Sequence, residues 1–166
     1  MVIAFVAAGA NMPGPHGPPE MAVSLGLRAI EGPDLRLVAR SRLYASKAWP
    51  DPRDPDFVNA VARIETDLNP QALLARLHEV EARFGRERRV ANAPRTLDLD
   101  VIDYDGRISR DDENPVLPHP RMADRAFVLL PLAELALNWR HPATGRTIGD
   151  LIAGLNEPAA AWPIEP

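Results

Sequence analysis

A short segment near the middle of the chain alternates apolar and acidic side chains, and it constrains the fold more than any other feature. Leu97, Leu99 and Val101 alternate with Asp98 and Asp100. Successive side chains of a β-strand point to opposite faces, so the apolar residues would share one face. The two carboxylates would share the other face, about 6 to 7 Å apart. The pattern therefore predicts a strand with one buried face and one acidic face.

The acidic pair predicts a site for a divalent cation. Two carboxylates this close repel each other, and aspartate is disfavoured in strands, so the pair costs stability unless a cation offsets both charges. Magnesium is commonly held by one or two carboxylates together with the phosphates of a substrate. From Asp98 and Asp100 alone, the alternative of a solvated polar face on an edge strand stays open.

Arginines are concentrated directly upstream of the acidic pair. Within thirteen positions the chain carries Arg83, Arg86, Arg88, Arg89 and Arg95. The planar guanidinium group binds phosphate oxygens through two parallel hydrogen bonds. A run of arginines is more often a solvated loop, or else a patch for nucleic acid. The acidic neighbours here favour a polyphosphate bound with its magnesium ion.

Composition favours a small enzyme over a nucleic-acid-binding protein. The chain has 19 Lys and Arg against 23 Asp and Glu, a formal net charge of −4, and its positive charge is local. The 166 residues suit one compact domain, and the absence of cysteine excludes disulfides, thiolate metal sites and a cysteine nucleophile. The apolar first ten residues lack a basic leader, and no stretch approaches the roughly 20 apolar residues of a membrane span. We expect a cytoplasmic protein with no membrane or nucleic-acid partner.

The order of predicted elements indicates the fold class. Strands are expected at residues 2–8, 35–46 and 57–66 and at the acidic segment. One helix is expected at residues 20–30. A second helix is expected to begin at Pro70, after the capping residue Asn69, and to end at Gly85. The order strand, helix, strand, strand, helix, strand predicts an α+β, ferredoxin-like split βαβ sandwich, in which two helices pack on one side of an antiparallel sheet.

The rest of the chain is predicted to be a C-terminal appendage on this sandwich. Two short helices are expected, one after Pro131 and one after Thr147. Residues 157–166 are expected to form a loosely ordered tail, so that residues 1–156 make a single domain.

Several segments together resemble one enzyme family. Residues 93–102, Ala-Pro-Arg-Thr-Leu-Asp-Leu-Asp-Val-Ile, resemble the signature of the 6-hydroxymethyl-dihydropterin pyrophosphokinases of folate biosynthesis. Other motifs of that family are matched in the same order by residues 9–11, 57–60, 81–86, 117–119, 125–127 and 131–132. The similarity covers roughly residues 2–155, so residues 1–156 would form the pyrophosphokinase domain.

The resemblance implies a reaction and assigns roles to charged residues. The enzymes transfer diphosphate from ATP to the hydroxyl of 6-hydroxymethyl-7,8-dihydropterin, giving AMP and the pterin diphosphate, by in-line displacement with two Mg²⁺ ions. Asp98 and Asp100 would hold the two ions, and Arg86 and Arg95 would be catalytic, balancing charge on the transferred group. The further ATP-binding residues would be Glu81, Arg88, Arg89, His119 and Arg125. The partners would be the two small-molecule substrates, and the chain would be a monomer.

The resemblance also assigns the pterin site. Phe57 and Phe127 would stack on the flat ring. Asn59 would hydrogen-bond the ring edge together with the segment from Ser46 to Trp49. From the residues alone, core packing is the favoured interpretation of the two phenylalanines, whereas an asparagine inside a strand needs polar partners.

Two alternative functions remain compatible with the residues. The first is another magnesium-dependent nucleotidyl or phosphoryl transferase, because metal and arginines specify phosphate chemistry and not the acceptor. The second is a non-catalytic ferredoxin-like module that binds a ligand without turnover.

Overall fold

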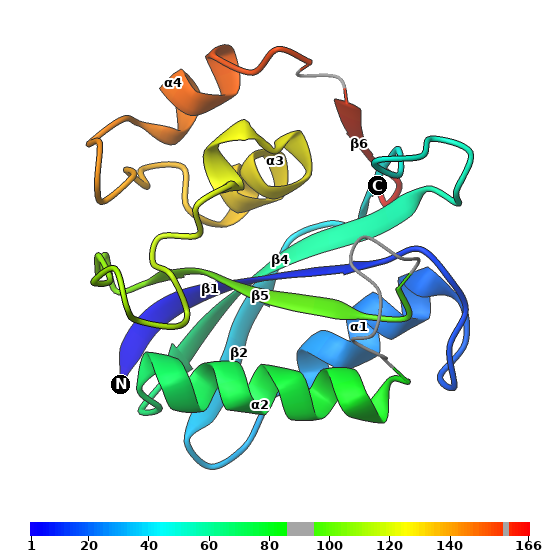
Figure 1. Cartoon of the computed structure of the whole chain (residues 1–166), viewed down its shortest axis with the longest axis horizontal. Coiled ribbons are helices and arrows are strands. Elements are labelled where there is room, and N and C mark those ends of the chain that lie inside the picture. Colours follow the sequence, from blue (N-terminus) through cyan, green and yellow to red (C-terminus); the bar gives the residue numbers. More distant parts are fainter. Residues whose placement is uncertain (86–94, 158–159) are drawn as a thin grey trace.

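A computed structural model describes residues 1–85, 95–157 and 160–166. This part of the chain forms an antiparallel β-sheet core with helices on both faces (Figure 1). The strands are β1 (Val2–Ala10), β2 (Leu35–Arg40), β3 (Tyr44–Ser46), β4 (Phe57–Thr66), β5 (Asp98–Tyr104) and β6 (Ala161–Pro163). The helices are α1 (Pro19–Ala29), α2 (Pro70–Arg83), α3 (Ala126–Leu135) and α4 (Ile148–Ala153), with a 3₁₀ turn at Met122–Asp124.

The strands form one antiparallel sheet. Its order is β5-β1-β4-β3-β6, and β2 pairs with the same edge of β4 as β3 does. Every strand pairing is antiparallel. The expected combination of an antiparallel sheet with packed helices is therefore confirmed.

Helices α1 and α2 cover one face of the sheet and enclose the main core. Val23 and Leu27 of α1 and Leu73 and Leu77 of α2 are fully buried against β1, β4 and β5. These residues recur at helical spacing, which places them on one side of each helix. The predicted start of α2 is confirmed, because the Asn69 side chain accepts a hydrogen bond of 2.8 Å from the backbone N–H of Ala72.

Helices α3 and α4 pack on the opposite face. Their apolar side chains form a second core with Phe5, Val61 and Ile102 of the sheet. Both faces of the central strands are therefore largely covered. In the described part of the chain, no helix is both long and apolar enough to cross a membrane.

The predicted single strand over residues 35–46 is wrong, because it is broken into β2 and β3. At the break, the backbone N–H of Ser41 donates to the carbonyl of Val61 at 2.9 Å. The Ser41 hydroxyl accepts a hydrogen bond of 3.0 Å from the backbone N–H of Val61. A side-chain oxygen thus replaces a backbone carbonyl, and the regular ladder stops for three residues.

The C-terminal elements match the expectation in part. A helix follows Thr147 as predicted, and the Thr147 hydroxyl caps it by accepting from the backbone N–H of Asp150 at 3.0 Å. The other helix begins at Ala126, earlier than expected, and contains Pro131. Proline removes one backbone donor, and burial of the apolar side chains around it outweighs that loss.

The end of the chain differs from the loosely ordered tail that we expected. Residues 161–163 form β6, which pairs with β3. Beyond it, the backbone N–H of Ile164 donates to the carbonyl of Leu43 at 2.9 Å. Pairing with an open sheet edge satisfies the backbone groups of this short segment, which its composition did not indicate.

Candidate active site

A cavity of about 380 Å³ opens on the α3 side of the sheet. Its walls come from β1, β4 and β5, from β3 and the residues after it, and from the start of α3. The lining residues are Ala7, Ala8, Gly9, Ser46, Lys47, Trp49, Phe57, Asn59, Arg95, Asp98, Asp100, Ile102, Asp124, Arg125, Phe127 and Val128.

Most of the predicted site residues that the structure describes line this cavity. They are Ser46, Trp49, Phe57, Asn59, Arg95, Asp98, Asp100, Arg125 and Phe127. Glu81 and His119 are not part of its lining. Arg86, Arg88 and Arg89 lie outside the described residues.

Strand register brings the polar side chains together. Gly9 of β1 is paired with Asp98 of β5 on one side and with Asn59 of β4 on the other. A Cβ atom on residue 9 would lie 3.2 Å from Oδ1 of Asn59, so glycine leaves room for the neighbouring amide. Leu97, on the opposite face of the sheet, is fully buried. The predicted alternation of buried and acidic faces along β5 is confirmed.

Arg95 is fixed beside the acidic pair. Its Nη1 lies 2.5 Å from Oδ2 of Asp98. The side chain of Asp98 is 20% exposed and that of Asp100 is 41% exposed, so both can be reached by a ligand in the cavity.

The backbone of Arg95 is held by Asn11, just after β1. The Asn11 side-chain oxygen accepts from the backbone N–H of Arg95 at 2.7 Å, and the Asn11 backbone N–H donates to the Arg95 carbonyl at 3.0 Å. The Asn11 amide also donates to the carbonyl of Pro55 at 3.2 Å. Asn11 therefore joins Arg95 to the loop that precedes β4.

His119 lies next to the acidic pair, although it does not line the cavity. Its Nε2 is 4.0 Å from Oδ2 of Asp100, and its Nδ1 accepts from the backbone N–H of Arg121 at 3.1 Å. Burial, with a contribution from the positive charge of Arg125, lowers the pKa of His119 to about 4. The imidazole is therefore neutral at pH 7 and carries its proton on Nε2, facing Asp100.

Arg125 and Phe127 form the wall contributed by the start of α3. The guanidinium carbon of Arg125 lies 5.4 Å from the ring centroid of Phe127. Burial lowers the pKa of Arg125 from its ordinary value, but an arginine remains charged at neutral pH. A cation and an aromatic face therefore stand side by side in the cavity.

Ser46 and Asn59 form a polar pair at the β3–β4 wall. The Asn59 amide donates to the Ser46 hydroxyl at 2.9 Å, and both residues are buried. Phe57, the register partner of Ser46, also lines the cavity. Trp49 lies in the segment after β3 and is 70% exposed.

Glu81 lies in α2, which packs on the other face of the sheet, and it is 1% exposed. Its ATP-binding role stays a prediction. Two further charged residues line the cavity: Lys47, which lies in the segment from Ser46 to Trp49 that the resemblance implied, and Asp124, which sequence reasoning missed. Lys47 forms an ion pair of 3.1 Å with Asp56, and Asp124 lies in the turn before α3. Asp124 belonged to no pattern that could have indicated it.

The donor set fits a hard divalent cation. Asp98 and Asp100 offer carboxylate oxygens from one strand face into the cavity. Across residues 1–85, 95–157 and 160–166, no group of three or more His, Asp or Glu side chains is arranged to hold a metal ion. Magnesium at this pair would take its other ligands from water and phosphate oxygens, as it commonly does.

Comparison with known proteins identifies the family. Residues 5–137 match the family described as 7,8-dihydro-6-hydroxymethylpterin-pyrophosphokinase (HPPK). The chain belongs to this family. The match includes every lining residue of the cavity, so the site lies within the segment that defines HPPK proteins.

Relatives named as pyrophosphokinases or folic acid synthesis proteins are about 40% identical to this HPPK chain over the aligned residues. The 2-amino-4-hydroxy-6-hydroxymethyldihydropteridine pyrophosphokinase of Synechocystis is 41% identical over 126 residues, which cover 76% of this chain and 63% of that protein. The protein of the same name from Pseudomonas aeruginosa is 41% identical over 150 residues, covering 90% of this chain and 89% of that protein. The folic acid synthesis protein fol1 of Pneumocystis carinii is 38% identical over 114 residues, only 15% of its length. The chain thus spans less than two thirds of some of these relatives.

Solved structures support the fold. The crystal structure of Plasmodium falciparum HPPK-DHPS wild type with STZ-DHP superposes with a TM-score of 0.69 at 12% identity. The superposition covers 92% of this chain and 43% of that one. The architecture of the two is therefore the same over nearly the whole chain.

Proposed function

We propose that this chain transfers a diphosphate group from ATP to the hydroxyl of 6-hydroxymethyl-7,8-dihydropterin and releases AMP. One observation carries the proposal. A single cavity contains a charged end that is suited to phosphate, with Arg95, Asp98 and Asp100, and an end that is suited to a flat heterocycle, with Phe57 and Asn59. A substrate that spans both ends would present its hydroxyl to the acidic pair.

The phosphate end supplies fixed charge of both signs. Asp98 and Asp100 would hold two Mg²⁺ ions, which would neutralise charge on the triphosphate when bound. Arg95 and Arg125 would donate hydrogen bonds to phosphate oxygens, and the ion pair between Arg95 and Asp98 shows that this guanidinium reaches the acidic pair. His119, neutral with its proton on Nε2, would be a further donor. Glu81, Arg86, Arg88 and Arg89 remain proposed contacts to ATP.

The other end would recognise the pterin. Phe57 and Phe127 both line the cavity and would stack on the ring, an arrangement that aromatic faces favour. Asn59 would bond the polar edge of the ring, with Ser46 holding its amide in place. Trp49, which is largely exposed, would add apolar cover at the entrance.

The chemistry requires positioning and not a protein nucleophile. The pterin hydroxyl oxygen would bond to the β-phosphorus and lose its proton to water, while the bond from that phosphorus to the oxygen of the α-phosphate would break and AMP would leave with that oxygen. Holding the two reactants in line and stabilising charge accounts for most catalysis of this kind. The inventory of arginines and carboxylates in the cavity agrees with that requirement.

The proposal includes the finer architecture. Helix α1 follows β1, α2 follows β4, and β5-β1-β4-β2 are neighbours in that order, which supports a ferredoxin-like split βαβ unit. We propose that residues 1–156 act as one pyrophosphokinase domain with the C-terminal elements as an appendage. The protein would work as a cytoplasmic monomer without nucleic-acid or membrane partners, consistent with its net charge of −4.

The products of the reaction test the proposal. The chain is incubated with ATP, Mg²⁺ and 6-hydroxymethyl-7,8-dihydropterin, and nucleotides are separated by chromatography. AMP and pterin diphosphate should appear together, and only when all three are present. ADP would instead indicate a different phosphoryl transferase, and pterin binding without any turnover would indicate a ligand-binding module. Asp111→Asn, an exposed aspartate outside the cavity, serves as the matched control for Asp98→Asn.

A further inference from the structure

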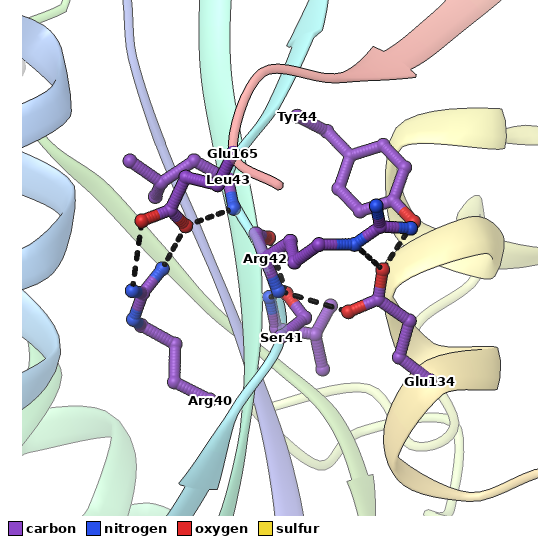
Figure 2. Close-up of polar contacts among 8 residues, drawn as sticks. Arg40, Ser41, Arg42, Leu43, Tyr44, Glu134 and Glu165 are labelled. Carbon is purple, nitrogen blue, oxygen red and sulfur yellow. Dashed lines mark hydrogen bonds and ion pairs between the residues drawn. The ribbon is translucent and has the colours of Figure 1, made fainter.

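Glu134, near the end of α3, connects that helix to the segment that leads into β3 (Figure 2). Its Oε2 accepts from the backbone N–H of Arg42 at 2.9 Å. Its Oε1 accepts from Nε of Arg42 at 2.8 Å and from the hydroxyl of Tyr44 at 2.5 Å. One carboxylate thus receives three hydrogen bonds, from Arg42 in the segment before β3 and from Tyr44, the first residue of β3.

Tyr44 links this contact to the polar pair of the cavity. Tyr44 and Ser46 are two residues apart in β3, so they share one face of the strand. The register partner of Tyr44 in β4 is Asn59, whose amide donates to Ser46. A displacement of Tyr44 would therefore move β3, which carries Ser46 and pairs with Asn59 of β4.

The other end of α3 contributes to the same cavity. Phe127 and Val128, in its first turn, are lining residues. The buried ring of Tyr44 packs in a small cluster with Ala126, the first residue of α3, and Phe127 packs against that cluster. The hydroxyl of Tyr44 donates to Glu134 at the far end of the helix, so Tyr44 belongs to the cluster at the start of α3 and is also bonded to its end.

We propose that Glu134 is a positioning residue that sets the spacing between the α3 wall and the β3 wall of the cavity, and thereby the affinity for the pterin. This inference rests on the proposed function. Glu134 does not line the cavity itself, and its effect would pass through Tyr44 to Ser46 and Asn59.

The electrostatics of the contact support a fixed link. Burial alone would raise the pKa of Glu134, but hydrogen bonds from Tyr44 and Arg42 hold that pKa below its ordinary value. The carboxylate is therefore charged at neutral pH, and its hydrogen bonds are of the stronger, charge-assisted kind. Burial and the bond to Glu134 raise the pKa of Tyr44, so its hydroxyl stays protonated and can donate.

A second carboxylate holds the same segment from its other side. Glu165 accepts from the backbone N–H of Leu43 at 2.6 Å and from Nη1 of Arg40 at 3.0 Å. Figure 2 shows Glu165 and Glu134 on opposite sides of the segment. Of the two, only Glu134 belongs to an element that lines the cavity, so only its loss should act selectively on pterin binding.

The test compares Glu134→Gln with Glu113→Gln. Glu113 is a matched control because it also accepts from an arginine side chain, Arg107, and from a backbone N–H, that of Arg110, with a similar side-chain exposure of 22% against 24%. It lies in a segment without cavity-lining residues. Pterin affinity is measured by titration calorimetry, and KM is measured separately for pterin and for ATP.

We expect Glu134→Gln to weaken pterin binding and raise the pterin KM by about tenfold, the effect of losing one charge-assisted hydrogen bond. The KM for ATP should stay within about twofold of the wild type. Tyr44→Phe, which removes a single hydroxyl, should also weaken pterin binding. It replaces Glu134→Gln in the test if that variant does not fold. The double variant should be no weaker than the worse single variant, because both remove the same link.

Two results would overturn the inference. The first is a pterin affinity in Glu134→Gln and Tyr44→Phe equal to that of Glu113→Gln. The second is an equal rise in both KM values, which would mean a general structural role. A wild-type chain that binds no pterin would instead overturn the proposed function, so the two failures are distinguishable.

Discussion

The amide of Asn59 donates a hydrogen bond of 2.9 Å to the hydroxyl of Ser46, between two strands that meet at the wall of the cavity. Asn59 is 4% exposed and Ser46 is 3% exposed. A buried polar pair of this kind costs free energy if either partner is lost. The pair therefore holds an amide in a defined orientation at the edge of the proposed pterin site.

The contributions of Asn59 and Ser46 to the free energy of unfolding should be coupled. Asn59→Ala should lower the free energy of unfolding by about 1 to 3 kcal/mol, because it removes the bond and leaves the Ser46 hydroxyl buried without it. Ser46→Ala should cost about 1 kcal/mol. Urea denaturation of both single variants and the double variant measures the coupling. Strictly additive effects would contradict a direct interaction.

Substitutions of Asp98 and Asp100, the two β5 aspartates that line the cavity, should have similar effects on turnover but different effects on the stability of the fold. Asp98→Asn and Asp100→Asn should each lower turnover by about a hundredfold or more, the usual effect of removing one charge that stabilises a transition state. Asp98→Asn also removes the ion pair with Arg95, so its free energy of unfolding should fall by about 1 kcal/mol. Asp100→Asn relieves repulsion and should not destabilise the fold. Initial rates and thermal melting check both, and an active Asp98→Asn variant would contradict the metal assignment.

Asp103, on the same strand but away from the cavity, should make stability depend on pH. Burial raises the pKa of Asp103, opposed in part by the hydrogen bond from Nε1 of Trp139 at 3.3 Å. A carboxyl with a higher pKa in the folded protein than in the unfolded chain stabilises the fold at pH values below its unfolded-state pKa. This stabilisation is lost as the pH rises through its folded-state pKa. Asp103→Asn should therefore raise the melting temperature at pH 7, and the gain should shrink toward pH 4. A gain that is constant with pH would contradict this account.

Gly26 of α1 should not tolerate alanine, although alanine usually stabilises helices. A Cβ at residue 26 would lie 2.6 Å from Cδ2 of Leu97, which is fully buried directly before Asp98. Overpacking of about 1 to 3 kcal/mol should exceed the helix-propensity gain of about 1 kcal/mol. Gly149→Ala in α4, where the nearest contact is 3.8 Å, is the matched control and should be neutral or stabilising. A melting temperature that is higher for Gly26→Ala than for Gly149→Ala would contradict this packing.

Local periodicity was sufficient to predict most of the central fold. The alternation of Leu97, Asp98, Leu99 and Asp100 predicted both faces of β5, because a strand that packs on one side requires it. The bounds of β4 agree with the expected residues 57–66, and Asn69 and Gly85 mark the start and end of α2 as predicted. These signals depend on neighbours in sequence, which is why they could be read directly.

Features that depend on distant residues could not be read in this way. The break after β2 results from a hydrogen bond between Ser41 and Val61, twenty positions apart. The pairing of β6 with β3 joins residues more than a hundred positions apart, and no local pattern indicates it. Helix α3 begins before Pro131 because burial of its apolar residues overrides the local preference of proline.

In the candidate site, too, local patterns could be read from the sequence, whereas contacts between distant residues could not. Strand alternation predicted that Asp98 and Asp100 share a face, but only the register of β1, β4 and β5 brings them near Gly9 and Asn59. The resemblance supplied Phe57 and Phe127, whose identity alone indicated core packing. The role of Asn11 in holding Arg95 requires the three-dimensional structure, because the two residues are 84 positions apart.

The most direct test of the central claim is a crystal structure of this chain with Mg²⁺ and a non-hydrolysable ATP analogue. We predict magnesium bound to the carboxylates of Asp98 and Asp100, with the triphosphate in the cavity beside Arg95. A nucleotide bound elsewhere, or an acidic pair without metal while the analogue is bound, would contradict the account.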